Sequence, residues 1–198
     1  MSQPPRRSLA GRPEATSHAA IEQAAFRLFA ERGFKATTID AIAAEVEVGR
    51  RTLFRYYVSK NDIPWGQFDR TTDGFRQILD AMPDDIPLHA AVHRAVLAFN
   101  DFPEDAEPPH RERMRLILQT PTLQAHSVLR YAEWRAVIAG YVAGRLGLEP
   151  EDLVPRTVGQ VSLALTLTAY EQWLDPPGQS LREILDATMA ALVRHLTE

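Results

Sequence analysis

Apolar residues recur every three or four positions along most of this chain, and this spacing constrains its fold more than any other feature. The first stripe contains five residues at helical spacing: Ile21, Ala24, Ala25, Leu28 and Phe29. Such a stripe is typical of an amphipathic helix with one face on a core. Strands would instead show alternating β-branched residues, and no segment stands out in this way. The spacing therefore predicts an all-α protein of about nine helices.

Glycines, prolines and capping residues divide the chain into these helices. Gly33 would end the first helix, and Thr38 suits the N-cap of a short second one. A third helix is expected over residues 50–57, inside a three-helix head. A longer fourth helix should follow the capping residues 59–62 and begin late or bend at Pro64, because proline lacks an N–H. The remaining helices are expected over residues 88–99, 111–118, 123–146, 151–174 and 181–196.

The composition describes a globular chain with an uneven charge. Its 198 residues are 45% hydrophobic, which is enough for a sizeable core. With no cysteine, disulfides, cysteine-based zinc sites and thiol nucleophiles are excluded. Residues 1–60 carry ten Lys and Arg against six Asp and Glu, whereas residues 61–198 carry twelve against twenty. A basic head on an acidic body indicates that only the head meets a polyanion.

The start of the chain is polar and holds Arg6, Arg7 and Arg12, so it lacks the apolar core of a signal peptide. No stretch approaches the 18 uncharged apolar residues that a transmembrane helix needs. We therefore expect no membrane partner and a cytoplasmic protein.

Residues 161–170 are apolar nearly all round, and such a helix has to be covered on more than one side. The last helix also has a continuous apolar face. Two adjacent helices with spare apolar surface predict a symmetric four-helix interface in a homodimer. The alternative is a central helix buried within a monomer. The residues expected at the interface are Val158, Ser162, Leu165, Leu185 and Leu192.

Most of residues 20–60 follow one pattern. It runs Ala25-x-x-Leu28-Phe29-x-x-x-Gly33-Phe34-x-x-Thr37-Thr38-x-x-x-Ile42-Ala43, then Val48-x-x-x-Thr52-Leu53-Phe54-x-Tyr56-Tyr57-x-Ser59-Lys60. This pattern resembles the TetR family of bacterial transcriptional regulators. The chain departs from the family at Glu47, where glycine is usual in the turn of the helix-turn-helix. We therefore expect backbone strain, or a different turn, at this residue.

The resemblance implies that the third helix enters the major groove of double-stranded operator DNA. Leu53, Phe54 and Tyr57 are expected on its core side. Arginine can read guanine bidentately or clamp a phosphate, although the arginines of this segment could also merely solvate an exposed face. The residues expected at DNA are Thr38, Gly49, Arg50, Arg51, Thr52, Arg55, Tyr56 and Lys60. Among them, the resemblance gives backbone-contacting roles to Thr38, Tyr56 and Lys60.

Segments of the body resemble a narrower group, the TetR-type regulators of mycofactocin gene clusters in actinobacteria. They are Pro64-Trp65-Gly66-x-Phe68-Asp69, Phe99-Asn100-x-Phe102-Pro103 and Gln124-Ala125-His126-Ser127-x-Leu129-Arg130-Tyr131-x-x-Trp134-Arg135. This resemblance implies control of genes for a redox peptide cofactor and an acyl-CoA effector. The alternative is a TetR-type regulator of a drug-efflux or catabolic operon with a different hydrophobic effector.

TetR-like proteins hold an effector between the middle helices, and candidate lining residues occur there. They are Trp65, Phe68, Phe99, Met114, Leu118, Tyr131, Trp134, Thr166 and Tyr170. An anionic headgroup would meet His126, Arg130 and Arg135, or the run Arg111, Arg113 and Arg115. Each single aromatic residue is more often ordinary core than pocket lining, and the arginine run could be a solvated face that pairs with Glu107 and Glu112.

Sites of other kinds are not expected. His89 and His93 lie one helical turn apart, but no third metal ligand accompanies them, and no catalytic motif is present. We therefore expect no metal, no cofactor and no enzymatic activity. The sequence predicts a ligand-responsive homodimeric repressor, with a DNA-binding domain at 1–60 and an effector-binding and dimerisation domain at 61–198. The alternatives are an architectural DNA-binding protein without an effector and an enzyme with an unrecognised site.

Overall fold

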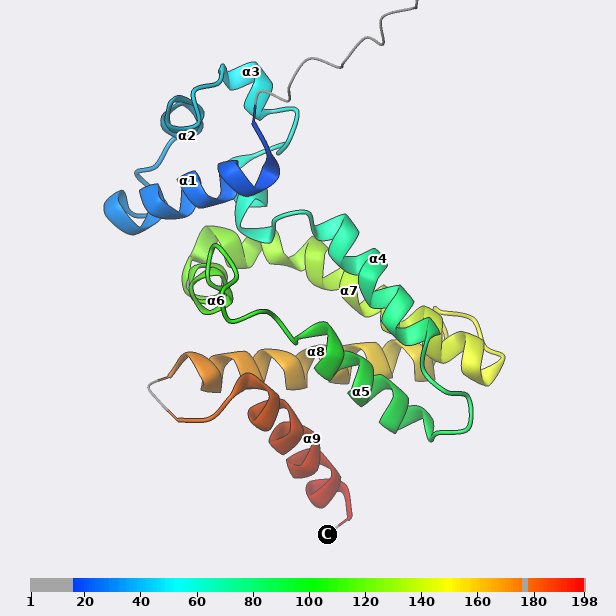
Figure 1. Ribbon diagram of the computed structural model, residues 1–198. Coiled ribbons are helices and arrows are strands. Elements are labelled where there is room, and N and C mark those ends of the chain that lie inside the picture. Colours follow the sequence, from blue (N-terminus) through cyan, green and yellow to red (C-terminus); the bar gives the residue numbers. More distant parts are fainter. Residues whose placement is uncertain (1–15, 176–177, 198) are drawn as a thin grey trace, which may run out of the picture. The chain divides into compact units, whose positions relative to one another are not determined.

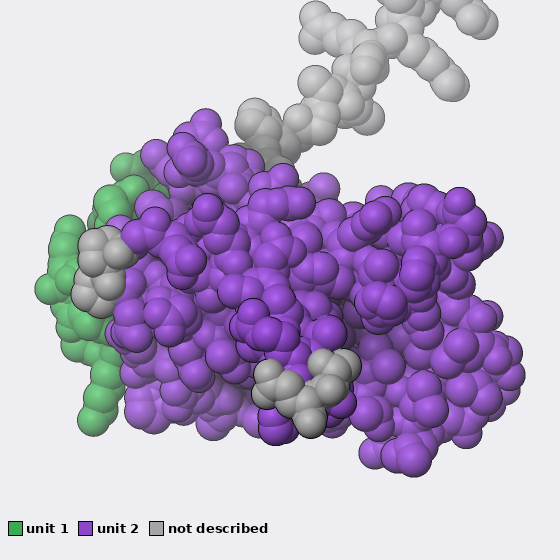
Figure 2. All heavy atoms as spheres, turned by 90° about the horizontal axis from the view of Figure 1, so that it is seen from below, with its two compact units in different colours: residues 1–60 green, residues 61–198 purple. Residues whose placement is uncertain are grey.

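The computed structural model describes residues 16–175 and 178–197, so Arg6, Arg7 and Arg12 lie outside the described part. Within these ranges the chain forms nine α-helices and one short 3-10 helix, η1, and no strand (Figure 1). The prediction of an all-α fold is confirmed. No helix in the same ranges is both long and apolar enough to cross a membrane. Two compact units are present, residues 1–60 and 61–198 (Figure 2).

The first unit contains three helices around a small core: α1 (His18–Arg32), α2 (Ile39–Glu45) and α3 (Arg50–Leu53). The apolar stripe of α1 is buried, as its spacing predicts. Gly33 ends α1 with φ 79°, and its N–H donates to the carbonyl of Phe29. Thr38 caps α2, because its hydroxyl accepts a hydrogen bond of 3.1 Å from the backbone N–H of Ala41. The predicted ends of these helices are therefore confirmed.

The third helix is shorter than expected, since α3 ends at Leu53 and hydrogen-bonded turns continue to Tyr57. Leu53 and Tyr57 are buried on the core side. Phe54 is 40% exposed, so its expected place in the core is wrong. Residues four apart share a helix face, whereas the next residue is rotated by roughly 100°. Once Leu53 and Tyr57 face the core, Phe54 has to turn toward solvent.

The second unit contains the remaining six α-helices. They are α4 (Phe68–Asp80), α5 (Leu88–Phe99), α6 (His110–Gln119), α7 (Pro121–Leu146), α8 (Leu153–Leu174) and α9 (Leu181–Thr197). The fourth helix begins late, as the proline suggested. Residues before it form η1 (Lys60–Trp65), and Gly66 with φ 61° separates η1 from α4.

The two longest helices, α7 and α8, pack against each other in the second unit, and α8 also contacts α5, α6 and α9 (Figure 1). Their backbones approach closely at Gly159, where an added Cβ would lie 2.9 Å from the carbonyl oxygen of Arg135. Glycine is required there because real Cβ atoms do not come so near a backbone oxygen. The hydrophobic core of this unit includes Phe75 and Ile138, which are fully buried.

Candidate nucleic-acid interface and effector site

The turn between α2 and α3 adopts a strained conformation. Glu47 has φ 54°, in the left-handed region. Its N–H donates to Ala44 (3.1 Å), and the next N–H, of Val48, donates to Ala43 (2.9 Å). A residue with a Cβ pays roughly 1–2 kcal/mol in this region. The strain expected from a glutamate at the family's glycine position is present.

We expect Glu47→Gly to raise the free energy of unfolding by about 1 kcal/mol, because glycine adopts this conformation without the Cβ penalty. Chemical denaturation would measure the change. Glu47→Ala is the matched control, since it removes the carboxylate but keeps the Cβ. If alanine stabilised the protein as much as glycine, charge rather than backbone strain would be responsible.

Three arginines lie exposed on and directly after α3. Arg51 and Arg55 have no ion-pair partner among the described residues. Arg50 pairs with Asp40 at 3.1 Å, and its guanidinium lies 5.5 Å from the ring centre of Phe54. Both partners of this ion pair are well exposed, and exposed pairs contribute little to stability. All three side chains can therefore reach a phosphate or a base edge at small cost.

Other residues expected at DNA are engaged within the first unit. The hydroxyl of Tyr56 donates to the carbonyl of Thr16 at 2.7 Å. The ammonium of Lys60 donates to the carbonyls of Phe34 (2.6 Å) and Thr37 (2.7 Å), and partial burial lowers the pKa of Lys60. Lys60 thus holds two loop carbonyls, where sequence reasoning placed it on the DNA surface. The three remaining positions comprise two exposed residues, Thr38 and Gly49, and the half-buried Thr52.

The aromatic residues expected to line an effector tunnel pack against one another inside the second unit. Trp65 contacts Phe68 and Tyr131 edge to face, with ring centres 5.4 and 5.6 Å apart. Trp134 stacks on the buried Phe75, and Phe99 contacts the same ring at a tilt of 42°. The other expected lining residues that belong to this core or pack on it are Met114, Leu118 and Tyr170. These side chains therefore form one aromatic and apolar core.

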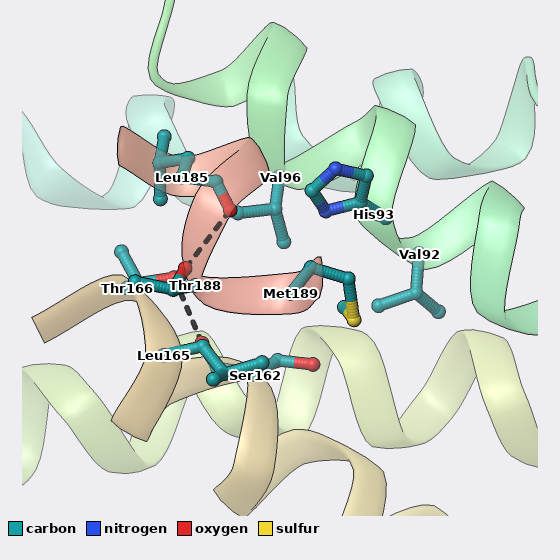
Figure 3. A pocket seen from close by; sticks show the side chains of 9 residues that line it. All are labelled: Val92, His93, Val96, Ser162, Leu165, Thr166, Leu185, Thr188 and Met189. Carbon is teal, nitrogen blue, oxygen red and sulfur yellow. Dashed lines mark hydrogen bonds between the residues drawn. The ribbon is translucent and has the colours of Figure 1, made fainter. Parts of the chain in front are cut away.

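A small pocket lies between α5, α8 and α9 and is partly open to solvent; its free volume of about 10 Å³ is that of a single water molecule (Figure 3). Among the residues expected to bind an effector, Thr166 lines this pocket. Its hydroxyl donates to the carbonyl of Ser162 (2.8 Å). Ligand sites for drug-sized molecules usually start at roughly 300 Å³. A larger effector would therefore require the body to open.

Two residues expected at an anionic headgroup bind a carboxylate instead. His126 and Arg130, one turn apart on α7, contact the same oxygen of Asp62 at 2.9 and 3.1 Å. Two further carboxylates, of Asp69 and Glu133, lie 3.6 Å from the Arg130 guanidinium. Three carboxylates around one guanidinium leave no excess positive charge for an anion. The structure thus does not support the headgroup role expected for this pair.

The other arginines of the body differ in their surroundings. Arg113 of α6 donates to the carbonyl of Pro64 in η1 at 2.7 Å. Arg111 donates to the carbonyl of Asp175 and lies over the ring of Trp173. Arg115 is exposed and Arg135 half-buried. Arg111 and Arg113 therefore have backbone-carbonyl partners in addition to any carboxylate pairing that the solvated-face alternative expected.

A buried chain of hydrogen bonds joins three elements of the second unit. The hydroxyl of Tyr170 on α8 donates to the side-chain carbonyl of Asn100, at the end of α5, at 2.5 Å. His110 Nε2 on α6 lies 2.8 Å from the same hydroxyl. Because Tyr170 has one hydrogen to give, His110 donates from Nε2, a tautomer assigned from the network. The His110 ring also stacks on Phe102 at 3.7 Å.

Burial, together with the charge of Arg113, lowers the pKa of His110 from 6.5 to about 3. Between about pH 6.5 and 3, His110 is protonated in the unfolded chain but stays neutral in the folded chain. Protonation therefore favours the unfolded chain, and the free energy of unfolding falls as the pH falls through this range. We expect the free energy of unfolding of wild type to fall by about 3 kcal/mol more than that of His110→Gln between pH 7 and 4. Urea titrations at both pH values would measure this difference. If the free energy of unfolding fell equally for both proteins between pH 7 and 4, a neutral, buried His110 would be refuted.

Sequence reasoning missed Asp62, Asn100 and His110. Asp62 was interpreted only as a helix-capping acid. His126 and Arg130, one turn apart on a helix, did indicate that an acidic partner lies nearby. Asn100 and His110 carry no such signal, because their shared partner Tyr170 lies 70 and 60 positions away.

The described part of the chain contains no cluster of three potential metal ligands. His93, one of the two histidines considered for a metal, instead contacts Asp186 of α9 at 2.7 Å. This contact ties α5 to α9.

The N-terminal part and the C-terminal part of the chain each match a known protein family. Residues 21–63 match the family described as bacterial regulatory proteins of the tetR family, and residues 86–197 match the MftR C-terminal domain. The chain is 46% identical over 183 residues to a Mycobacterium tuberculosis protein assigned as a mycofactocin biosynthesis transcriptional regulator, MftR, and the match covers 92% of each. It is 31% identical to the transcriptional regulator TcmR of Streptomyces glaucescens, over 75% of this chain and 69% of TcmR.

Solved structures share the fold at lower identity. Thermus thermophilus FadR, a TetR-family repressor crystallised with lauroyl-CoA, is 20% identical with a TM-score of 0.57, over 89% of this chain and 93% of FadR. SmeT, the repressor of a Stenotrophomonas maltophilia multidrug efflux pump, is 22% identical with a TM-score of 0.59, over 90% and 91%. The chain belongs to the TetR family of bacterial transcriptional regulators, with a C-terminal domain of the MftR type.

Proposed function

We propose that this protein is a ligand-responsive repressor that binds a pseudo-palindromic operator as a homodimer in the bacterial cytoplasm, on the nucleoid. Residues 1–60 would form the DNA-binding domain, and residues 61–198 the effector-binding and dimerisation domain. The observation that carries this proposal is the pair of exposed arginines, Arg51 and Arg55, at the recognition helix of a TetR-family head. Two such heads on one dimer would read two half-sites about one helical turn apart.

We expect Arg51→Ala to weaken operator binding about tenfold or more, because one base or phosphate contact contributes roughly 1–3 kcal/mol. Fluorescence anisotropy with a labelled DNA fragment from upstream of the protein's own gene, at fixed salt, would measure the change. Arg51→Lys separates the two roles, since lysine keeps the charge but loses the bidentate geometry. Arg32→Ala, which removes the same charge at the end of α1, should have a much smaller effect.

A dimer interface on α8 and α9 has to use the residues that these helices expose. Ser162 and Leu185 are buried within the protomer, and Leu165 lines the pocket of Figure 3, so these three expected contacts offer a partner little or no surface. Val158 and Leu192 are half-buried. Exposed apolar side chains on the same two helices are Leu153, Val154, Val161, Val193 and Leu196. We infer that this exposed set forms the interface, because association would remove these apolar side chains from water.

A long-chain acyl-CoA is the effector that the relatives favour. The relative with 46% identity is assigned to mycofactocin biosynthesis, and FadR, which shares the fold, binds lauroyl-CoA. The aromatic and apolar core of the body would accommodate an acyl chain once it opens. Genes for mycofactocin synthesis or for acyl-CoA-linked redox enzymes would then be the targets.

The same anisotropy assay tests the effector by adding lauroyl-CoA. Release of the operator would support both the repressor and its acyl-CoA effector. Specific binding that ignores lauroyl-CoA would retain a DNA-binding regulator and favour a different hydrophobic effector, as for a drug-efflux or catabolic operon, or an architectural protein without one. Absence of specific binding would refute the proposed operator function.

A further inference from the structure

We propose that the indole N–H of Trp65 and the hydroxyl of Tyr131 form a hydrogen-bonding anchor for an uncharged acceptor oxygen, such as a carbonyl, of an apolar effector. This inference rests on the proposed function, since it specifies which polar group of an effector the body recognises. It concerns a different kind of contact from the charged headgroup site that the sequence suggested.

Both polar atoms are buried without a hydrogen-bond partner in the described part of the chain. The two side chains touch edge to face, with ring centres 5.6 Å apart. Buried side-chain donors nearly always have a partner, because an unpaired one loses its hydrogen bond to water without replacement. Two orphaned groups on contacting side chains therefore indicate a place where a ligand supplies the missing partner.

Neighbouring buried groups in the same body are paired, which makes these two distinctive. Tyr170 donates to Asn100, and Thr166 donates to a carbonyl one turn earlier. Ser127 lies near Tyr131 but donates its hydroxyl hydrogen to the carbonyl of Leu123 at 2.7 Å, and no hydrogen bond of normal geometry joins the two hydroxyls. The two groups thus lie in a unit whose other buried side-chain polar atoms, among the residues that the structure describes, all have partners.

The chemistry of the two atoms defines the ligand group. The indole nitrogen can only donate. Burial is the main cause that raises the pKa of Tyr131, and the charge of Glu171 adds to it, so the hydroxyl remains a donor at neutral pH. Two donors require an acceptor, and a carbonyl oxygen has two lone pairs. The negative charge of Glu171 and the apolar ring of Phe68 disfavour an anion at the same place.

The position of Trp65 connects this anchor to control of DNA binding. Trp65 is the last residue of η1, whose first residue, Lys60, is bonded to carbonyls of the DNA-binding unit. Between them, η1 is held to the body through Asp62 and the carbonyl of Pro64. An oxygen bound by Trp65 therefore acts on the short element that leads into the head. If the protein binds the oxygen with different affinity in two positions of η1, effector binding and operator binding become coupled.

Two matched probes test the proposal: lauroyl-CoA and S-dodecyl-CoA, a thioether that differs in lacking the carbonyl oxygen. Titration calorimetry should show wild type binding lauroyl-CoA about tenfold more tightly, as expected for a lost acceptor. Trp65→Phe and Tyr131→Phe should each lose most of this preference. Tyr141→Phe is the control and should retain it, because the Tyr141 hydroxyl is already engaged by Arg145 at 2.7 Å.

Unfolding of the ligand-free proteins gives a second readout. Tyr131→Phe should not lower the thermal midpoint, since it removes a hydroxyl that makes no bond, whereas Tyr141→Phe should lower it. Equal binding of the two probes by wild type, binding of neither, or a midpoint loss for Tyr131→Phe as large as that for Tyr141→Phe would overturn the proposal. Operator binding is measured on the same proteins without probes. If it is retained, such an outcome contradicts only the proposed anchor; if it is absent, the repressor function fails as well.

Discussion

Replacing Val161 with glutamate should convert the protein to monomers and weaken operator binding by about a hundredfold or more. Val161 lies in α8 with 38% of its surface exposed, among the exposed apolar residues that we propose for a dimer interface. A carboxylate there would be buried without a partner on association. Binding of two heads to one operator gains affinity from their linkage, and a monomer loses this gain. Sedimentation velocity would measure the mass, and anisotropy the affinity.

Val128→Glu is the control for this experiment. Val128 is an apolar residue of α7 with 63% exposure, so the substitution introduces the same charge at a more exposed position. We expect this variant to remain a dimer with unchanged operator affinity. A dimeric Val161→Glu protein would show that the interface lies elsewhere.

The second large effect is expected from Gly159→Ala, which should lower the free energy of unfolding by about 2 kcal/mol. The added methyl group would lie 2.9 Å from the carbonyl oxygen of Arg135, a backbone atom that cannot turn aside. Relief of this clash requires α7 and α8 to separate, which would loosen the core that they share. Urea denaturation followed by circular dichroism would measure the loss.

Gly140→Ala provides the matched comparison, because Gly140 lies in α7 and an added Cβ meets no atom within 4 Å. Alanine favours a helix over glycine, so we expect this variant to gain about 0.5–1 kcal/mol. Equal changes at both glycines would show that helix propensity, rather than the close approach of two backbones, controls Gly159.

Helix positions were predictable because they depend on local periodicity and capping. The expected helix at 88–99 matches α5, Leu88–Phe99, and Thr38 caps α2 as its hydroxyl suggested. The strain at Glu47 was predictable for the same reason, since a turn has its own backbone requirements. Phe54 was misplaced, because apolar character alone does not tell which side of a one-turn helix faces a small core.

The partners of polar side chains were not predictable from local pattern. His126 and Arg130 were recognised as cations on one face of α7, but nothing in their spacing identified Asp62 as the carboxylate that they share. Tyr170 was assigned to an effector tunnel, whereas in the structure its hydroxyl is hydrogen-bonded to Asn100 and His110. Such contacts join residues 60 to 70 positions apart, and only the packing of helices brings them together.

The sequence by itself determined the all-α architecture, the strained turn and the exposed arginines of the head, because these follow from repeat spacing and from short motifs. The tertiary structure decided which charges neutralise one another, which face of α8 reaches solvent and which polar atoms lack a partner. Those outcomes depend on helix crossings such as that of α7 and α8 at Gly159, where distances between remote residues are set. The donors of Trp65 and Tyr131 are unsatisfied for this reason: packing buries both atoms, and no described neighbour accepts a hydrogen bond from either.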